Sequence, residues 1–278
     1  MTSLANYAIV RLNDETIDDK MSAKILFDML TPAIGQLTFS QPARRNALNA
    51  QMWADLPKVL AKATKTEGLR VLIVTGTGEH FSSGADISEF ETLYATAKSA
   101  KDISDEITAG FEALAKFPLP TIAMIRGSCI GGGCGLALCC DIRFADTTSK
   151  FGITPAKLGL VYPFADMQRL IETVGIPHAK DILLSARHIQ AKAARKMGLI
   201  NQLFKVDNLE SKTHDYAHRM TKLSPQSLKI TKQMFAAYQN GQFGETAQSM
   251  DWFLDGFVSD NFKTGYKAFL EKRKPDFS

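Results

Sequence analysis

The sequence predicts an α/β protein with a core that ends near residue 200 and a helical part after it. Two observations lead to this prediction. Up to that point, short apolar runs typical of buried strands alternate with longer helical patterns. From Ala179 onward, almost every segment has a helical pattern. A chain of 278 residues is long enough to bury a large core in this arrangement.

The expected elements of the core follow one another along the chain. Residues 1–24 are interpreted as a leader, and the core as residues 25–200. Strands are expected at Ile34–Phe39, Val71–Thr75, Thr121–Ile125 and Ile142–Ala145. Helices are expected at Ala50–Thr66, where Pro57 can cause a kink, at Tyr94–Phe117, which ends before Pro118 and Pro120, and at Cys134–Cys140.

The C-terminal part is predicted to be helical throughout and is assigned to residues 201–278. Together with the end of the core, its expected helices are Asp181–Ser185, Ala191–Met197, Asn208–Leu223, Pro225–Gln239, Phe243–Phe257 and Asn261–Arg273. The pattern therefore indicates a core followed by a helical appendage.

Composition excludes several classes of protein. The 33 basic and 29 acidic residues give a net charge of +4, which is too small to indicate nucleic acid binding. No apolar run approaches the ~20 residues of a membrane helix. The N-terminus has no signal-peptide pattern, and its four acidic residues within 13–20 argue against a transit peptide. We therefore expect a cytoplasmic protein that binds neither nucleic acid nor membrane.

The four cysteines all lie within residues 129–140. A zinc site is one interpretation of such a cluster. However, the spacing contains no Cys-x-x-Cys pair, no histidine is near, and the segment is apolar. We interpret the cysteines as small buried apolar residues and expect no metal.

Two strand–glycine–helix units, about 50 residues apart, carry the strongest indication of chemistry. In the first, Val71–Thr75 is followed by Gly76, Gly78 and Gly84; in the second, Thr121–Ile125 is followed by residues 131–133, all glycine. Glycine turns leave backbone N–H groups accessible to a ligand. A Walker loop would need a Gly-Lys-Ser/Thr run, which is missing, and a dinucleotide fingerprint fits only loosely. Two such turns facing one carbonyl oxygen would form an oxyanion hole.

These two turns resemble the crotonase, or enoyl-CoA hydratase/isomerase, superfamily. The matching stretches are residues 81–87 (FSSGADI) and 127–141, and residues 42–49 (PARRNALN) resemble the first CoA-contacting turn of that family. Residues 193–201 and 268–275 resemble later family runs. The resemblance covers about residues 34–277. It implies a spiral of ββα units, with the C-terminal helices forming a homotrimer or a dimer of trimers.

The resemblance also implies the site residues. The N–H groups of Ala85 and Gly132 would bind the thioester oxygen of an acyl-CoA, which is a substrate, so no separate cofactor is expected. Further binding residues implied by the family pattern are Arg44, Ala47, Ser83, Asp86, Ile87 and Gly131. Asp86 and Asp141 are expected to cap helices or brace turns, and His80 to face solvent.

The chain departs from the hydratases of this family at both catalytic glutamates. Those positions hold Gly135 and Pro155, and neither can transfer a proton. The run from Phe151 to Tyr162 instead resembles methylmalonyl-CoA decarboxylases, although those have His where this chain has Ala85. An oxyanion hole with a tyrosine hydroxyl and no nearby carboxylate suits decarboxylation, so Tyr162 is a candidate catalytic residue, or else a packing residue.

Two alternatives remain open at this point. The chain could be an enoyl-CoA hydratase or isomerase that uses other acid/base groups, with Asp166 and Glu112 as candidates, although both residues also suit structural or surface roles. It could also be a CoA-binding oligomer without catalytic activity, since the same loss of two glutamates is consistent with lost catalysis.

Overall fold

A six-stranded sheet forms the centre of the molecule, in the order β1-β2-β3-β4-β6-β9. The structure is a computed structural model and describes residues 23–277. The strands are β1 Lys24–Thr31, β2 Ile34–Ser40, β3 Val71–Gly76, β4 Thr121–Ile125, β6 Ile142–Asp146 and β9 Gln202–Phe204. β1 pairs antiparallel with β2, and the other pairs are parallel. Every residue of β3 and β4 is buried, as expected for parallel strands covered on both faces.

A second, three-stranded sheet lies beside the first one. It has the order β5-β7-β8, with β5 Ser128–Ile130, β7 Lys150–Gly152 and β8 Ile189–Gln190. β5 pairs parallel with β7, and β8 pairs antiparallel with β7. Because β5 follows β4 and immediately precedes the glycine run, this small sheet fixes the position of the second glycine turn.

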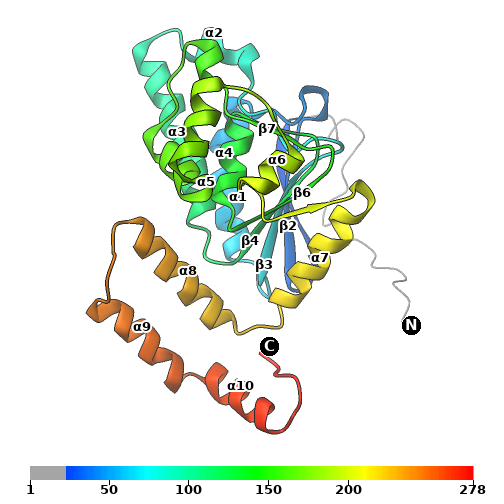
Figure 1. Cartoon of the computed structure of the whole chain (residues 1–278), viewed down its shortest axis with the longest axis vertical. Helices are drawn as coiled ribbons and strands as arrows, with labels where there is room; N and C mark the ends of the chain where they lie inside the picture. Colours follow the sequence, from blue (N-terminus) through cyan, green and yellow to red (C-terminus); the bar gives the residue numbers. More distant parts are fainter. Residues whose placement is uncertain (1–22, 278) are drawn as a thin grey trace.

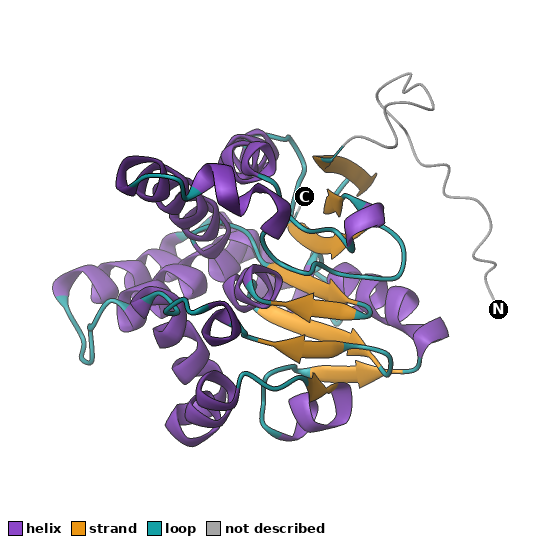
Figure 2. Cartoon of the chain, turned by 90° about the horizontal axis from the view of Figure 1, so that it is seen from above, coloured by secondary structure: helices purple, strands orange, loops and turns teal. Residues whose placement is uncertain are grey.

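The helices surround the sheets on both sides (Figures 1 and 2). They are α1 Ala50–Thr64, α2 Phe90–Leu93, α3 Ala97–Ala115, α4 Gly132–Cys139, α5 Phe164–Ser185, α6 Ala191–Lys196, α7 Leu209–Met220, α8 Pro225–Gln239, α9 Ala247–Val258 and α10 Asp260–Leu270. The Asn49 side chain caps α1 by accepting from the N–H of Met52. α1 packs against α3 and buries Trp53, Leu56 and Leu60 at helical spacing.

The predicted α/β class and the helical C-terminal region are confirmed. Pro57 lies within α1, which continues through it to Thr64. The prediction missed β1. It also missed β5, β7, β8 and β9, because strands of two or three residues are too short to show a periodic pattern. It also reduced α5 to its last five residues, because Gly175, with φ of 74°, and Pro177 interrupt the helical pattern. The predicted leader lies outside the described residues, except for the last two positions.

The last three helices, α8 to α10, form a C-terminal group apart from the core (Figure 1). Polar contacts of α8 join this group to the core, and Arg70 donates to the oxygen of Phe277 after α10. Lys232 of α8 pairs with Asp141 at 2.6 Å, and Gln239 bonds to Glu172 of α5 at 3.0 Å. Many large apolar side chains of this group are exposed: Phe235, Tyr238, Phe243, Phe253, Leu254, Phe257, Val258, Phe262, Phe269 and Leu270. Exposed apolar side chains in this number are typical of an interaction surface. Among residues 23–277, no helix is both long and apolar enough to span a membrane.

Candidate active site

The two glycine turns lie against each other, although they are about 50 residues apart in sequence. The N–H of Ser82 donates to the carbonyl oxygen of Ser128 at 2.9 Å, and the N–H of Ile130 donates to that of Ser82 at 3.0 Å. A side chain on Gly133 would collide with the Ser82 carbonyl oxygen, so glycine is required there for this contact. The first turn is therefore attached to β5 as a short additional strand.

This contact places Gly84 and Ala85 next to the first residue of α4. Gly84 has φ of 94°, and a Cβ on it would stand 2.8 Å from the nitrogen of Gly132 and 2.9 Å from the oxygen of Ile130. Only glycine satisfies both the conformation and the spacing. The structure thus brings the two turns together at Gly84 and Gly132, and Ala85 is the residue that follows Gly84.

Neither backbone N–H at this junction has an acceptor among residues 23–277. Gly132 is the first residue of α4, where helix geometry leaves the N–H unpaired. Leu48 bonds to the oxygen of Gly84 and the nitrogen of Asp86 in a parallel bridge. Because successive N–H groups of an extended segment alternate in direction, the Ala85 N–H points away from Leu48. Two unpaired donors at the positive end of a helix suit an oxygen that becomes negative.

A buried asparagine that the sequence analysis did not single out braces the first turn. Asn46 is fully buried, its Nδ2 donates to the oxygens of Thr77 and His80, and its Oδ1 accepts from the N–H of Gln41. Its positive φ of 55° is tolerated by asparagine more readily than by most residues. The expectation for His80 was wrong: it is half-buried, and its Nδ1 accepts from the N–H of Ser128 at 3.1 Å.

Asp86 joins residues 42–49, here called the CoA-type turn after their resemblance to a family turn, to the first glycine turn. Its carboxylate pairs with Arg44 at 2.7 Å, accepts from Gln41 at 3.1 Å and caps the 3-10 helix Ile87–Glu89 through Ser88. Burial of Asp86 works to raise its pKa, but the bonds from Ser88, Arg44 and Gln41 outweigh burial and lower the pKa. The predicted bracing role of Asp86 is confirmed, as is that of Asp141, which accepts from Thr121.

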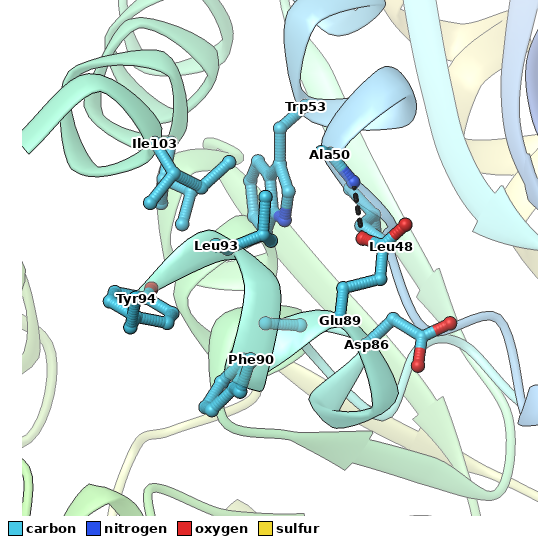
Figure 3. Close-up of a pocket in the computed structure, with 11 residues that line it drawn as sticks. Leu48, Ala50, Trp53, Asp86, Glu89, Phe90, Leu93, Tyr94 and Ile103 are labelled. Atoms are coloured by element: carbon cyan, nitrogen blue, oxygen red, sulfur yellow. Dashed lines mark hydrogen bonds between the residues drawn. The ribbon is translucent and has the colours of Figure 1, made fainter. Parts of the chain in front are cut away.

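A small cavity opens beside Ala85, between α1 and α3 (Figure 3). Its volume is about 10 Å³, which is enough for roughly one water molecule. Its apolar lining includes Leu48, Trp53 and Ile103, and Ala85 stands at one side. Trp53 was not predicted as a site residue, because its spacing from Leu56 and Leu60 is that of any buried helix face.

The space that a glutamate would occupy at position 135 is filled. A Cβ on Gly135 would stand 2.9 Å from two ring carbons of Phe111 and 3.5 Å from the hydroxyl oxygen of Tyr162. The Phe111 ring in turn packs on Trp53, with ring centroids 5.3 Å apart. An aromatic side chain from α3 thus fills the space beside Gly135, and no pattern in the sequence marks Phe111 for that position.

Tyr162 lies in the segment between Pro155 and α5. Its hydroxyl oxygen stands 3.5 Å from where a Cβ of Gly135 would be. The hydroxyl oxygen is buried and has no partner among the described residues. Burial raises its pKa, and the nearby charge of Asp166 acts in the same direction. The hydroxyl therefore stays protonated at neutral pH and is available as a donor.

The two alternative carboxyl groups are both held by Arg169. Asp166, which is 6% exposed, pairs with it at 2.8 Å, and Glu112 pairs with it as well. Burial raises the pKa of Asp166, although Arg169 opposes this. A hydrogen bond from Lys116, together with the charge of Arg169, lowers the pKa of Glu112 despite burial. Both groups are therefore engaged in a structural ion-pair network beside Tyr162.

The other predicted residues are distributed around this junction. Gly131, with φ of 55°, donates its N–H to the oxygen of Gly152, and Pro155 begins the 3-10 helix Pro155–Leu158. The N–H of Ser83 donates to the oxygen of Arg45, and Ala47 is buried. Ile87 is 56% exposed.

All four cysteines are buried, as the sequence analysis expected, and none of them forms a disulfide. Burial raises the pKa of Cys140 to about 12, and it also raises the pKa of Cys129 and of Cys139. Thiols with raised pKa values are poor nucleophiles at neutral pH, so these three cysteines act as packing residues.

The chain is similar to known proteins in sequence and in structure. The family model for enoyl-CoA hydratase/isomerase matches residues 30–278. A solved structure of an enoyl-CoA hydratase/isomerase family protein from Hyphomonas neptunium is 38% identical, with a TM-score of 0.89 over 93% of this chain and 99% of that one. The 2,3-dehydroadipyl-CoA hydratase of Escherichia coli is 32% identical over 87% of this chain and 93% of that protein. The mevalonyl-coenzyme A hydratase of Aspergillus fumigatus is 30% identical over 89% and 92%, respectively.

Proposed function

Because this chain belongs to the enoyl-CoA hydratase/isomerase family, we propose that it stabilises the enolate of an acyl-CoA thioester with the N–H groups of Ala85 and Gly132. The main support for this proposal is that these two donors lie at one junction and lack acceptors among the described residues. Each donor directed at a developing oxyanion contributes about 3–4 kcal/mol to transition-state stabilisation. The CoA moiety is part of the substrate, and no further cofactor is proposed.

The reaction we propose is decarboxylation of a malonyl-type thioester. The bond between the α carbon and the carboxylate breaks, CO₂ leaves, and the electron pair forms the enolate whose oxygen the two N–H groups bind. Water or the Tyr162 hydroxyl then supplies the proton that the α carbon takes up. These steps need no carboxylate base at positions 135 and 155. The filling of the Gly135 position by Phe111 supports this choice over water addition.

Tyr162 is proposed to donate a hydrogen bond to the departing carboxylate or a proton to the enolate. Its support is a buried hydroxyl without a partner among the described residues, next to Gly135. Arg44, Ala47, Ser83, Asp86, Ile87, Gly131, Gly135 and Pro155 are proposed to line the substrate site. Arg44 is half exposed, so its guanidinium can approach a phosphate while it keeps its bond to Asp86.

A second candidate function is hydration or isomerisation of an enoyl-CoA. The printed names of several relatives favour it, since they are hydratases. In this chain it would require Asp166 or Glu112 as the acid/base group, and Asp166 is the better of the two because burial raises its pKa. A CoA-binding oligomer without turnover is the third candidate.

The exposed apolar side chains of the C-terminal group support assembly into a homotrimer or a dimer of trimers. We propose that these helices form its contacts. The net charge of +4 favours approach of an anionic CoA ester. We also propose that the protein is cytoplasmic.

Tyr162→Phe tests the proposed reaction, since it removes one hydroxyl and keeps the ring. We expect kcat/KM for malonyl-CoA to fall by about 10- to 150-fold, the value of a hydrogen bond to a charged group. Affinity for acetyl-CoA and the melting temperature should hold, because the lost volume is small. Unchanged malonyl-CoA turnover in this variant would reduce Tyr162 to a packing residue.

A further inference from the structure

The indole nitrogen of Trp53 is a buried donor with no partner among residues 23–277. The side chain is 2% exposed, and its Nε1 is one of the few buried polar atoms without an acceptor in that range. An indole N–H can only donate, and buried ones usually find an acceptor, because leaving one unpaired costs about 1–3 kcal/mol. The proposed chemistry of Ala85, Gly132 and Tyr162 does not use this group.

Trp53 lies next to both the small cavity and the Gly132 end of the junction. It lines the cavity together with Ala85. Its ring carbon Cζ2, two bonds from Nε1, lies 3.3 Å from where a Cβ of Gly132 would stand. Figure 3 shows the ring nitrogen on the side of the indole that faces Leu48. The unpaired donor is therefore within the candidate site and close to its oxyanion-binding junction.

None of the residues that line the cavity accepts a hydrogen bond from this donor. Most of the cavity wall is apolar, including Leu48 and Ile103. Glu89 also lines it, but its Oε2 accepts from the N–H of Ala50 at 2.8 Å (Figure 3). Asp86 is occupied by Arg44, Gln41 and Ser88. A donor in an apolar wall that lacks a protein acceptor is the arrangement by which binding sites fix one polar atom of a ligand.

We propose that the Trp53 Nε1–H is a specificity-determining donor that binds a second oxygen of the acyl group, beyond the thioester oxygen. This inference rests on the proposed function, because it takes an acyl-CoA as the ligand. The cavity of about 10 Å³ has room for roughly one water-sized group, so the oxygen belongs to a short acyl chain. A β-carbonyl or a malonyl-type carboxylate supplies such a second oxygen.

Binding affinities for matched thioesters test this inference. Butyryl-CoA and acetoacetyl-CoA have equal chain length and differ at the β-oxygen, and malonyl-CoA offers a carboxylate instead. In the native protein we expect at least one oxygen-bearing ester to bind about 10-fold more tightly than butyryl-CoA. In Trp53→Phe this preference should vanish, while affinity for butyryl-CoA changes little. Whichever oxygen-bearing ester loses affinity identifies the acceptor as a carbonyl or a carboxylate.

A preference that is equal in the native protein and in Trp53→Phe would overturn the inference and leave the proposed function standing. If neither butyryl-CoA nor acetyl-CoA binds the native protein, the proposed function falls, and this inference falls with it.

Fluorescence provides a second readout that does not depend on how Trp53→Phe folds. The chain has two tryptophans, so Trp252→Phe leaves Trp53 as the only indole. Trp252 lies in α9, outside the site. Rapid mixing with the oxygen-bearing ester should shift the emission of Trp53 to longer wavelength, because its N–H gains an acceptor, and butyryl-CoA should not. Identical emission with both esters would contradict the inference.

Discussion

The candidate site has two halves that are built in different ways. The backbone half consists of the two glycine turns that meet at Gly84 and Gly132, and the side-chain half consists of the groups around Gly135. In the backbone half, Gly84 and Gly132 approach so closely that any side chain on Gly84 would reach the main chain of the other turn. In the side-chain half, the Gly135 position faces the flexible end of another residue, Phe111. The first half admits almost no change, because main-chain atoms cannot move independently. In the side-chain half, one side chain can be replaced by another, and such a replacement can change the reaction.

Gly84→Ala should break the backbone half and give the largest effect. A Cβ there would stand 2.8 Å from the nitrogen of Gly132, so the two turns must separate. Loss of one oxyanion donor costs about 100- to 1000-fold in turnover. We expect a decrease of at least about 100-fold in kcat/KM for whichever CoA ester the protein converts, measured with the purified variant.

Gly78→Ala is the matched control for that experiment. Gly78 has a φ of 71°, similar to the 94° of Gly84, but no atom lies within 4 Å of its added Cβ. Gly78→Ala therefore has the same conformational cost of an alanine with positive φ, about 1–2 kcal/mol. It lacks the collision between the new Cβ and the other turn. Equal losses of turnover in the two variants would mean that strain, and not the junction of the turns, is responsible.

Gly135→Glu tests the side-chain half and should give an intermediate effect. The new Cβ would lie 2.9 Å from the Phe111 ring, so the single variant should lose about 1–3 kcal/mol of unfolding free energy through overpacking. Phe111→Ala removes the obstacle. In a double-mutant cycle the two changes should therefore offset each other by about 0.5–3 kcal/mol, measured by denaturant unfolding. Additive losses would show that Phe111 does not occupy the space of the missing glutamate.

Asp86→Asn tests the contact between the CoA-type turn and the glycine turn, with the smallest expected effect. Because the folded-state pKa of Asp86 lies below its ordinary value of 3.8, its charge stabilises the folded protein above that pH. This stabilisation is lost as the pH falls through the folded-state pKa. We expect the variant to be about 1 kcal/mol less stable at pH 7, with the difference shrinking below pH 3.8.

Asp102→Asn serves as the reference for Asp86, since its ion pair with Lys98 at 2.7 Å is on the surface. Exposed pairs of this kind contribute almost nothing to stability. A loss as large in this variant as in Asp86→Asn would show that Asp86 has no special part in holding the turns.

Sequence patterns predicted the parts of the fold and site that are long or rich in glycine. The bounds of β4 and α8 agree with the prediction, because apolar runs and the Ser224–Pro225 helix start are clear signals. The two glycine turns and their junction were predictable for the same reason. Phe111 and Trp53 were not, since each occupies a helical core position, and only the three-dimensional structure shows that they face Gly135 and Ala85.

The central claim is that this junction stabilises a thioester enolate in a site without a hydratase carboxylate, and a direct comparison of two reactions tests it. The measurement is kcat/KM of one preparation for decarboxylation of malonyl- or methylmalonyl-CoA and for hydration of crotonyl-CoA. One acid/base group contributes about 100- to 10,000-fold to hydration, so we predict decarboxylation to be faster by at least about 100-fold. Crotonyl-CoA hydration as fast as decarboxylation, or faster, would contradict the account and assign the proton transfer to Asp166 or Glu112.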